Sequence, residues 1–256
     1  MPIPFVNAGH AGPAAVPEKG RSATKQLSGF VNRYFYFSMS LLLAVIVVLG
    51  FSRTINNSLF HATPPRPFLL WIHGAVFASW VVFFIAQSTL VRVHKVNWHR
   101  FMGWFGAGLA AVMVPLGIAI ALVMARFDTV QLHMTDADAF LAIPFYGMLA
   151  FAVIIGLAIY WRKRPEFHRR LVLVATCGLM DAALARFDFV YDHHIFFLCV
   201  DLLIVVGVVR DLIVDRRVHK VYLYALPAVI VGQNLALYMW QSNPAWWRAI
   251  THAIMG

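Results

Sequence analysis

Acidic side chains and cysteines are scarce in this chain. Only 11 of its 256 residues are Asp or Glu, against 21 Lys and Arg, and only two are cysteine. Cys177 and Cys199 lie in apolar stretches at different depths by residue count, so we expect neither a structural disulfide nor a cysteine-based metal site. We interpret both as small residues of the packed interior.

The signatures of several protein classes are also missing. The sequence contains no phosphate-binding loop, dinucleotide fingerprint, nucleophile elbow or zinc-protease helix. A retinal protein would need a lysine within the last apolar stretch, Val221–Trp240, which has none. A seven-helix zinc hydrolase would need several histidines on the second and seventh spans, and the seventh has only His219, at its first turn. Whether the chain is an enzyme therefore stays open.

Long apolar stretches dominate the chain instead, and 61% of its residues are hydrophobic while 12% are charged. Most of these stretches are near the roughly 20 residues that cross a bilayer as a helix. They are Tyr34–Ser52, Phe68–Val91, Phe101–Ala125, Ala139–Trp161, Arg170–Phe187, Ile195–Ile213 and Val221–Trp240. The sequence therefore predicts an all-α integral membrane protein, a lipid-embedded bundle of seven transmembrane helices.

The basic residues predict the orientation of this bundle. With seven spans, the N-terminal segment and the loops after the second, fourth and sixth spans share one side, which holds all but five of the 21 Lys and Arg. The exceptions are Arg53, Arg66, Arg126, Arg186 and Arg248. The positive-inside rule then places the N-terminus in the cytoplasm and the C-terminus outside, in a bacterial inner membrane. The net charge of +10 is thus topological, and no nucleic-acid partner is expected.

The segments outside the spans complete the predicted organisation. Residues 1–30 are rich in Pro, Gly and Ala and form an expected flexible cytoplasmic tail, without the pattern of a cleaved signal peptide. Residues 31–243 form the transmembrane domain. Residues 244–256 contain Trp246, Trp247, Arg248 and His252 and form an expected short amphipathic segment at the outer interface.

Polar side chains inside the spans are functional candidates because each is costly in a membrane. Counted at about 1.5 Å per residue, six of them fall about 9 to 12 Å below the predicted outer ends of five helices. These six, here called the outer layer, are His73, Tyr146, Asp181, Asp201, Gln233 and Asn234. Arg186 lies about 7 Å above Asp181 on the same predicted span.

The outer layer has two interpretations. Its members could simply hydrogen-bond neighbouring helices to one another, with Arg186 as the cation. Alternatively, they could bind a small ligand, protons or a divalent metal from the outer side. The loop above adds His193 and His194 as further metal-ligand candidates.

Histidines also gather at the predicted cytoplasmic ends of the spans. His99 and His168 begin spans that run in the same direction, so they share one depth and could bind a haem iron from opposite sides. Gly103 and Gly106 would leave room for the flat macrocycle. The alternative is a hydrated basic interface with no cofactor.

This arrangement resembles the two-haem b-type cytochromes built on four-helix membrane bundles, which implies electron transfer to or from quinone. The resemblance covers the second to fifth spans. A second haem would pair His73 with a histidine of the fourth span, and that span has none. One haem b is therefore the most that the resemblance implies. A third possibility is an accessory subunit of a larger membrane complex, without a site of its own.

A second resemblance is centred on RKRPEFHRRLVLVATCGLMDAALARF, residues 162–187. Its matching positions are Arg164, Pro165, Glu166, His168, Arg169, Arg170, Leu171, Ala175, Thr176, Ala183 and Arg186. The pattern is similar to the signature of a group of bacterial multi-spanning membrane proteins, over roughly residues 65–245. An acidic residue often follows the fourth-span motif in that group, whereas Tyr146 and Gly147 follow it here. The resemblance implies no activity. We interpret Arg169 and Arg170 as topological charges or as ligands of lipid phosphates.

Overall fold

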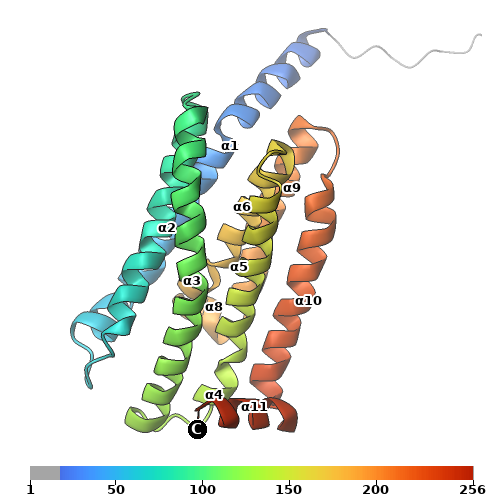
Figure 1. The fold of residues 1–256 in the computed structure, drawn as a ribbon. Helices are drawn as coiled ribbons and strands as arrows, with labels where there is room; N and C mark the ends of the chain where they lie inside the picture. Colours follow the sequence, from blue (N-terminus) through green and yellow to red (C-terminus); the bar gives the residue numbers. More distant parts are fainter. Residues whose placement is uncertain (1–17, 256) are drawn as a thin grey trace, which may run out of the picture.

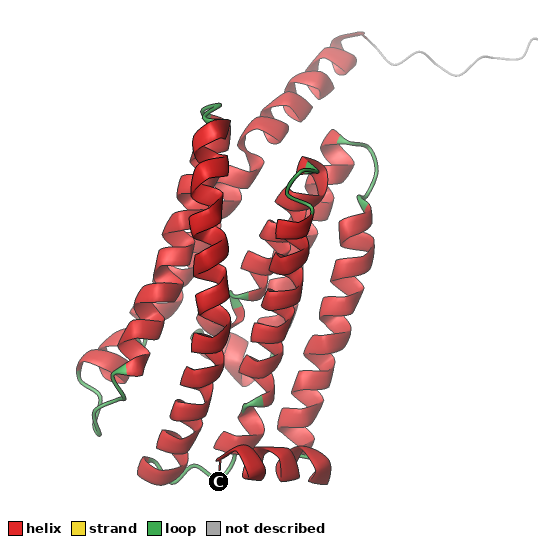
Figure 2. Ribbon diagram, viewed as in Figure 1, coloured by secondary structure: helices red, strands yellow, loops and turns green. Residues whose placement is uncertain are grey.

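The computed structural model describes residues 18–255, with side chains from residue 26 onward, and this part of the chain contains helices and no strand (Figure 2). The long helices run roughly along one direction, and the start of α1 and the C-terminal helix lie at opposite ends of the bundle (Figure 1). The long elements are α1 (Glu18–Ser52), α2 (Leu69–Arg92), α3 (Val96–Gln131), α5 (Ala142–Tyr160), α9 (Phe196–Val214) and α10 (Lys220–Ser242). The short ones are the π-helix η1 (Asn56–Phe60), α4 (Ala137–Phe140), α6 (Pro165–Gly178), α7 (Asp181–Leu184), α8 (Asp188–Asp192) and α11 (Ala245–Met255).

Five helices of the described chain are long and apolar enough to cross a membrane. They cover Gln26–Ser52, Leu69–Arg92, Val96–Gln131, Ala137–Tyr160 and Lys220–Ser242. The helix α9 has a suitable length but carries Asp201, Arg210 and Asp211. The all-α prediction is confirmed and a membrane location is supported, whereas seven spans and their orientation stay predictions.

The expected boundary of the N-terminal tail differs from the structure. Helix α1 begins at Glu18, so residues 18–30 belong to a helix and not to a flexible tail, while residues 1–17 lie outside the described part. Extending an existing helix needs no new nucleus, which explains why α1 continues past its apolar span. At the other end, α11 occupies the segment expected to be a short C-terminal helix, and its position at a membrane interface stays a prediction.

The fifth predicted span is not one helix. Helix α6 has 14 residues, or about 21 Å, and is therefore shorter than a hydrocarbon core of about 30 Å. It ends in a tight turn, in which the amides of Leu179 and Met180 donate to the carbonyls of Thr176 and Cys177. The Asp181 carboxylate then accepts a bond from the amide of Ala182. Local bonding of this kind competes with a continuous helix, and the chain proceeds through α7 and α8.

The half-length helix α6 is the centre of the bundle. Half of its residues are buried, including Leu171, Leu173 and Val174. On one side it packs with α1, α9 and α10 around Leu43 and Ile204. On the other side it packs with α2, α3 and α5 in a second apolar cluster. A substitution on either face of α6 therefore alters the packing of an apolar cluster.

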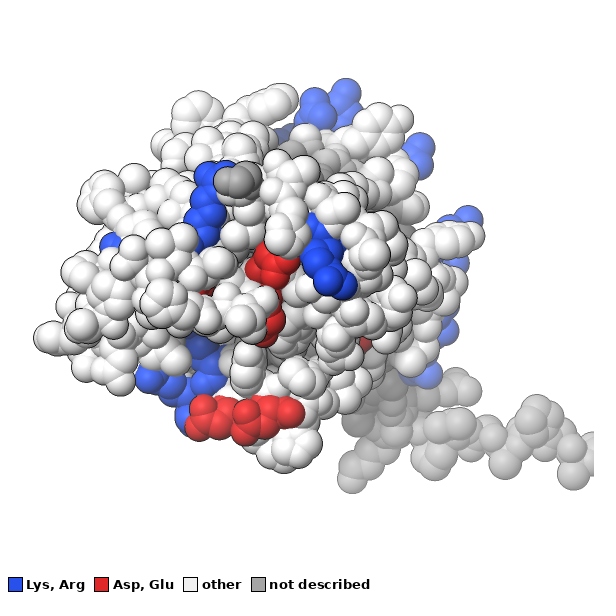
Figure 3. Space-filling model, turned by 90° about the horizontal axis from the view of Figure 1, so that it is seen from below, with Lys and Arg blue, Asp and Glu red and all other residues white. Residues whose placement is uncertain are grey.

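Helix α11 closes the end of the bundle at which the chain terminates (Figure 1). The indole Nε1 of Trp247 donates to the carbonyl of Ala139 at 3.2 Å, and Arg126 donates to the carbonyls of Ile254 and Met255. Most of the surface seen from this end is uncharged, with separate small groups of basic and acidic side chains (Figure 3). This end is the one that the basic residues predict to lie outside.

Candidate functional site

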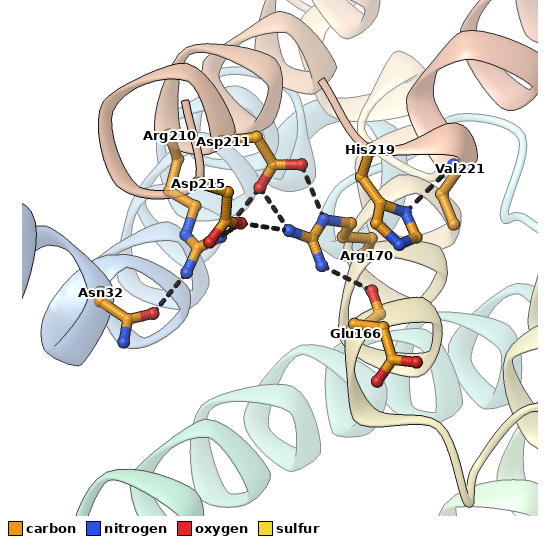
Figure 4. A network of polar contacts seen from close by, with 8 residues as sticks. All are labelled: Asn32, Glu166, Arg170, Arg210, Asp211, Asp215, His219 and Val221. Atoms are coloured by element: carbon orange, nitrogen blue, oxygen red, sulfur yellow. Dashed lines mark hydrogen bonds and ion pairs between the residues drawn. The ribbon is translucent and has the colours of Figure 1, made fainter. Parts of the chain in front are cut away.

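A buried network of ion pairs joins α6 to α9 (Figure 4). Arg170 of α6 donates through Nε and Nη2 to both oxygens of Asp211, at 2.8 and 2.7 Å. Arg210 donates to Asp211 at 2.8 Å, and both arginines reach Asp215 at 2.7 Å. The side chains of Arg170, Arg210 and Asp211 are 2% or less exposed. Because buried charges are tolerated only when paired, this network is a structural element of the end of the bundle at which α9 terminates.

The same network reaches two other elements. Arg210 also hydrogen-bonds the Asn32 side chain of α1, and Arg170 donates to the carbonyl of Glu166 at 2.7 Å. The interpretation of Arg170 as a topological charge or a lipid ligand is therefore wrong, because its guanidinium is buried against acidic partners. Asp211 and Asp215 were not recognised as candidates from the sequence. Their spacing of four residues, which places both on one face of an apolar helix, is the signal that could have found them.

A second feature is a cavity of about 90 Å³ between α2, α3, α5 and α6. Its walls are formed by Trp80, Phe83, Phe84, Gln87, His99, Gly103, Gly106, Ala107, Ile155, Ile159, His168 and Val172. The rings of His99 and His168 have centroids 6.2 Å apart and planes inclined at 73°. The fold thus brings together the two histidines and the two glycines that the sequence predicted to share one site.

Hydrogen bonding orients one of these histidines. The Nδ1 of His168 lies 2.9 Å from the carbonyl oxygen of Ala158, and a carbonyl can only accept, so the proton is on Nδ1. The Nε2 of His168 therefore carries the free lone pair, which is the arrangement found in metal-ligating histidines.

The cavity is also lined by buried polar atoms without partners. Within the described chain, no hydrogen bond reaches the Nδ1 of His99, either amide atom of Gln87, or the Nε1 of Trp80. Gln87 is 8% exposed and Trp80 is 4% exposed. Each buried polar atom left without a partner costs about 1–3 kcal/mol, so this concentration indicates a bound group or water.

The two glycines of α3 have different roles in the cavity. A Cβ added to Gly103 would meet no atom within 4 Å, so this residue borders open space. A Cβ added to Gly106 would lie 2.3 Å from the ring of Phe83, so this glycine lets Phe83 pack against α3. Gly103 is thus the position at which a larger side chain would fill the cavity.

Only part of the outer layer converges. Tyr146, Asp181 and Gln233 line a second cavity of about 20 Å³, and Asp201 lies beside Gln233. The Tyr146 hydroxyl donates to the carbonyl of Val229 at 2.8 Å. A cavity of this size holds about one water molecule. Neither carboxylate forms an ion pair with any side chain in the described range.

Three other residues predicted for this region make different contacts. Asn234 is exposed and donates to the carbonyl of Ile230 on its own helix, so its assignment to the interior layer is wrong. His73 stacks on Phe77 with ring centroids 4.2 Å apart. Arg186 is not bonded to Asp181; it donates to the Thr54 hydroxyl at 3.1 Å. Arg186 thus bonds the turn that follows α1, while its charge still acts on the Asp181 carboxylate without a direct contact.

The metal-site expectation finds no support in the geometry. In the described part of the chain, no three His, Cys, Asp or Glu side chains are close enough together to hold a metal ion. His193 bonds the carbonyl of Phe189 at 2.9 Å, and His194 packs edge-on against Trp240. These two histidines therefore do not converge with the outer layer.

Comparison with known proteins provides no related chain. No protein-family model, curated protein or solved structure matches this sequence. The chemistry of the sites is therefore argued from their geometry.

Proposed function

We propose that this chain is a multi-pass membrane protein that holds one b-type haem between His99 and His168 and takes part in electron transfer. The observation that carries the proposal is the pair of imidazole rings beside one cavity, with centroids 6.2 Å apart. Two imidazoles that bind one metal from opposite sides, through bonds of about 2 Å each, have ring centroids roughly 6 Å apart.

The surrounding residues support a haem better than an isolated metal ion. Only two ligands face the cavity, as in bis-histidine haem, whereas an isolated transition metal needs three or four. The wall carries the flat rings of Trp80, Phe83 and Phe84 and the open space beside Gly103. Trp80 lies seven residues from Gln87 on α2, and Gly106 lies seven residues from His99 on α3. Since all four residues line the cavity, it extends about 10 Å along the helices. When bound, haem supplies one-electron chemistry in a low-dielectric site.

The protein groups supply ligation and orientation. The bond from His168 to Ala158 directs Nε2 toward the site and makes the imidazole a stronger donor. With the N-terminus in the cytoplasm, both histidines lie near the inner side, where a lipid-soluble quinone is a suitable redox partner. The seven-span topology and the resemblance to the bacterial membrane-protein group belong to this same proposal.

An absorbance spectrum of the protein, purified in detergent from a haem-replete host, tests the proposal. We expect a Soret band with low-spin features that His99→Ala and His168→Ala each abolish, and that Gly103→Leu weakens by filling the cavity. The matched control is His94→Asn, since His94 is exposed near the same end and Asn tolerates its backbone φ of 62°. Absence of a Soret band, or an unchanged spectrum after both histidine changes, would remove the assignment and favour the accessory-subunit interpretation.

A second candidate function is proton binding in the outer layer. It is supported by two carboxylates that form no ion pair in the described chain: Asp181 lines a cavity of about 20 Å³, and Asp201 lies beside Gln233 of the same cavity. Inside a membrane, a carboxyl group that has no ion-pair partner favours its protonated, neutral form. Infrared difference spectroscopy would detect the carbonyl stretch of a protonated carboxyl, which Asp181→Asn or Asp201→Asn would then remove. No such band in the wild type would eliminate this candidate.

A further inference from the structure

No contact in the described chain explains why a polar residue, Gln87, is buried in the fold. The residue is only 8% exposed, yet neither the amide nitrogen nor the amide oxygen of its side chain has a hydrogen-bond partner in the described chain. It lines the same cavity as His99. An apolar residue at this position would avoid the desolvation cost, so the amide is expected to serve the site.

The two histidines of the site differ in their outer partners. His168 is oriented by the carbonyl of Ala158, whereas the buried Nδ1 of His99 has no partner. His99 lies in the first turn of α3, and Gln87 lies in the last two turns of α2, at nearly the same level of the antiparallel pair. The main chain of Gln87 lies beside the His99 ring, and the side chains of both residues line the same cavity.

We infer that Gln87 is the positioning residue of His99, with its amide oxygen accepting a hydrogen bond from the Nδ1–H of the ring. This inference rests on the proposed function, because it assigns the Nε2 of His99 to the iron. The bond satisfies two of the buried atoms at once and leaves the Gln87 amide nitrogen facing the cavity. It gives His99 the same protonation pattern that the Ala158 carbonyl gives to His168.

The bond has a consequence for the redox equilibrium. A hydrogen bond accepted from Nδ1–H increases the electron donation of a ligating imidazole, which stabilises the ferric state. Removing the acceptor therefore raises the midpoint potential, and a stronger acceptor lowers it. A residue that only filled space would not move the potential in two directions.

Redox titration of the purified holoprotein, followed by its absorbance, tests the inference. We expect a higher midpoint potential for Gln87→Leu and a lower one for Gln87→Glu, with bis-histidine low-spin spectra in both. The control is Thr251→Val, which removes another buried polar side chain, 0% exposed, from α11 and should leave the potential at the wild-type value.

The outcomes separate the two proposals. A wild type that carries no haem refutes the proposed function and this inference with it. A wild type that carries haem, but whose potential stays unchanged or moves in one direction in both Gln87 variants, refutes the inference alone. If Gln87→Leu does not fold, the direction of the shift in Gln87→Glu decides: a lower potential supports the inference, and an unchanged or higher one overturns it.

Discussion

Replacing Asp211 by Asn removes one charge from the buried network without changing its shape. Asp211 accepts three charge-assisted bonds, two from Arg170 and one from Arg210. Its side chain is 0% exposed, so water cannot replace the lost partner. After the change, Asp215, which is 35% exposed, is the one carboxylate that still pairs with these two buried guanidiniums among the described residues.

The expected loss is large for a single isosteric change. Breaking a buried ion pair while leaving the opposite charge in place costs about 3–5 kcal/mol. Asp215 accepts two bonds but is partly solvated, so Asp215→Asn should cost about 1–2 kcal/mol. Asp192→Asn, at an exposed position, should change stability by less than about 0.5 kcal/mol.

The free energy of unfolding, measured by SDS titration in mixed micelles, ranks the three variants. We expect Asp211→Asn to be the least stable, Asp215→Asn intermediate and Asp192→Asn close to the wild type. The pair Arg170→Gln and Asp211→Asn should be strongly non-additive in a double-mutant cycle, since each change removes the same bidentate contact. Equal stability of the Asp211 and Asp215 variants would show that the burial of Asp211 does not govern the energy of this network.

Three further predictions concern packing, pH and topology. Gly50→Ala should destabilise the fold by about 1–3 kcal/mol, because its Cβ would lie 2.3 Å from the main-chain oxygen of Ala183, whereas Gly108→Ala, with nothing within 4 Å, should be neutral or stabilising in the same SDS titration. Burial and the nearby Arg170 lower the pKa of His219. Its neutral Nδ1 accepts a hydrogen bond from the amide of Val221 and so caps α10. The contribution of this cap to the free energy of unfolding is therefore complete above about pH 6.5 and is lost as the pH falls below that value. Thermal unfolding between pH 5 and 8 measures this, and His219→Asn should flatten the profile. Reporter fusions after Gly256 should report an external C-terminus, and a cytoplasmic signal would contradict the positive-inside assignment.

The bundle itself was accessible from sequence because hydropathy acts on whole segments. A stretch such as Phe68–Val91 must be helical and covered by apolar surroundings wherever its neighbours lie, and α2 matches it within one residue at each end. The fifth span was not accessible in this way. Its break after Gly178 depends on a local competition between the Asp181 carboxylate and the helix backbone, which hydropathy does not register.

For the sites, the sequence predicts how deep a residue lies along its helix, but not toward which side of the helix its side chain points. His99 and His168 meet because short loops and a constant rise per residue fix the level of each side chain. Depth alone cannot give direction, however. Gln233 and Asn234 share one depth, but consecutive residues on a helix point about 100° apart, so only Gln233 faces the interior. The ion-pair network was missed because Arg210 was counted only as an inner-side charge.

The cavity between His99 and His168 and the ion-pair network both depend on one short helix, α6. His168 and Arg170 are two residues apart on α6, which is about 200° around a helix, so their side chains point to opposite faces. The ring faces the cavity and is held by Ala158 of α5, while the guanidinium is held by α9. We therefore expect Asp211→Asn to lower the free energy of unfolding and leave the absorbance spectrum of the folded holoprotein unchanged. A spectral change that accompanies the loss of stability would mean that the ion pairs, and not the Ala158 carbonyl, set the orientation of His168.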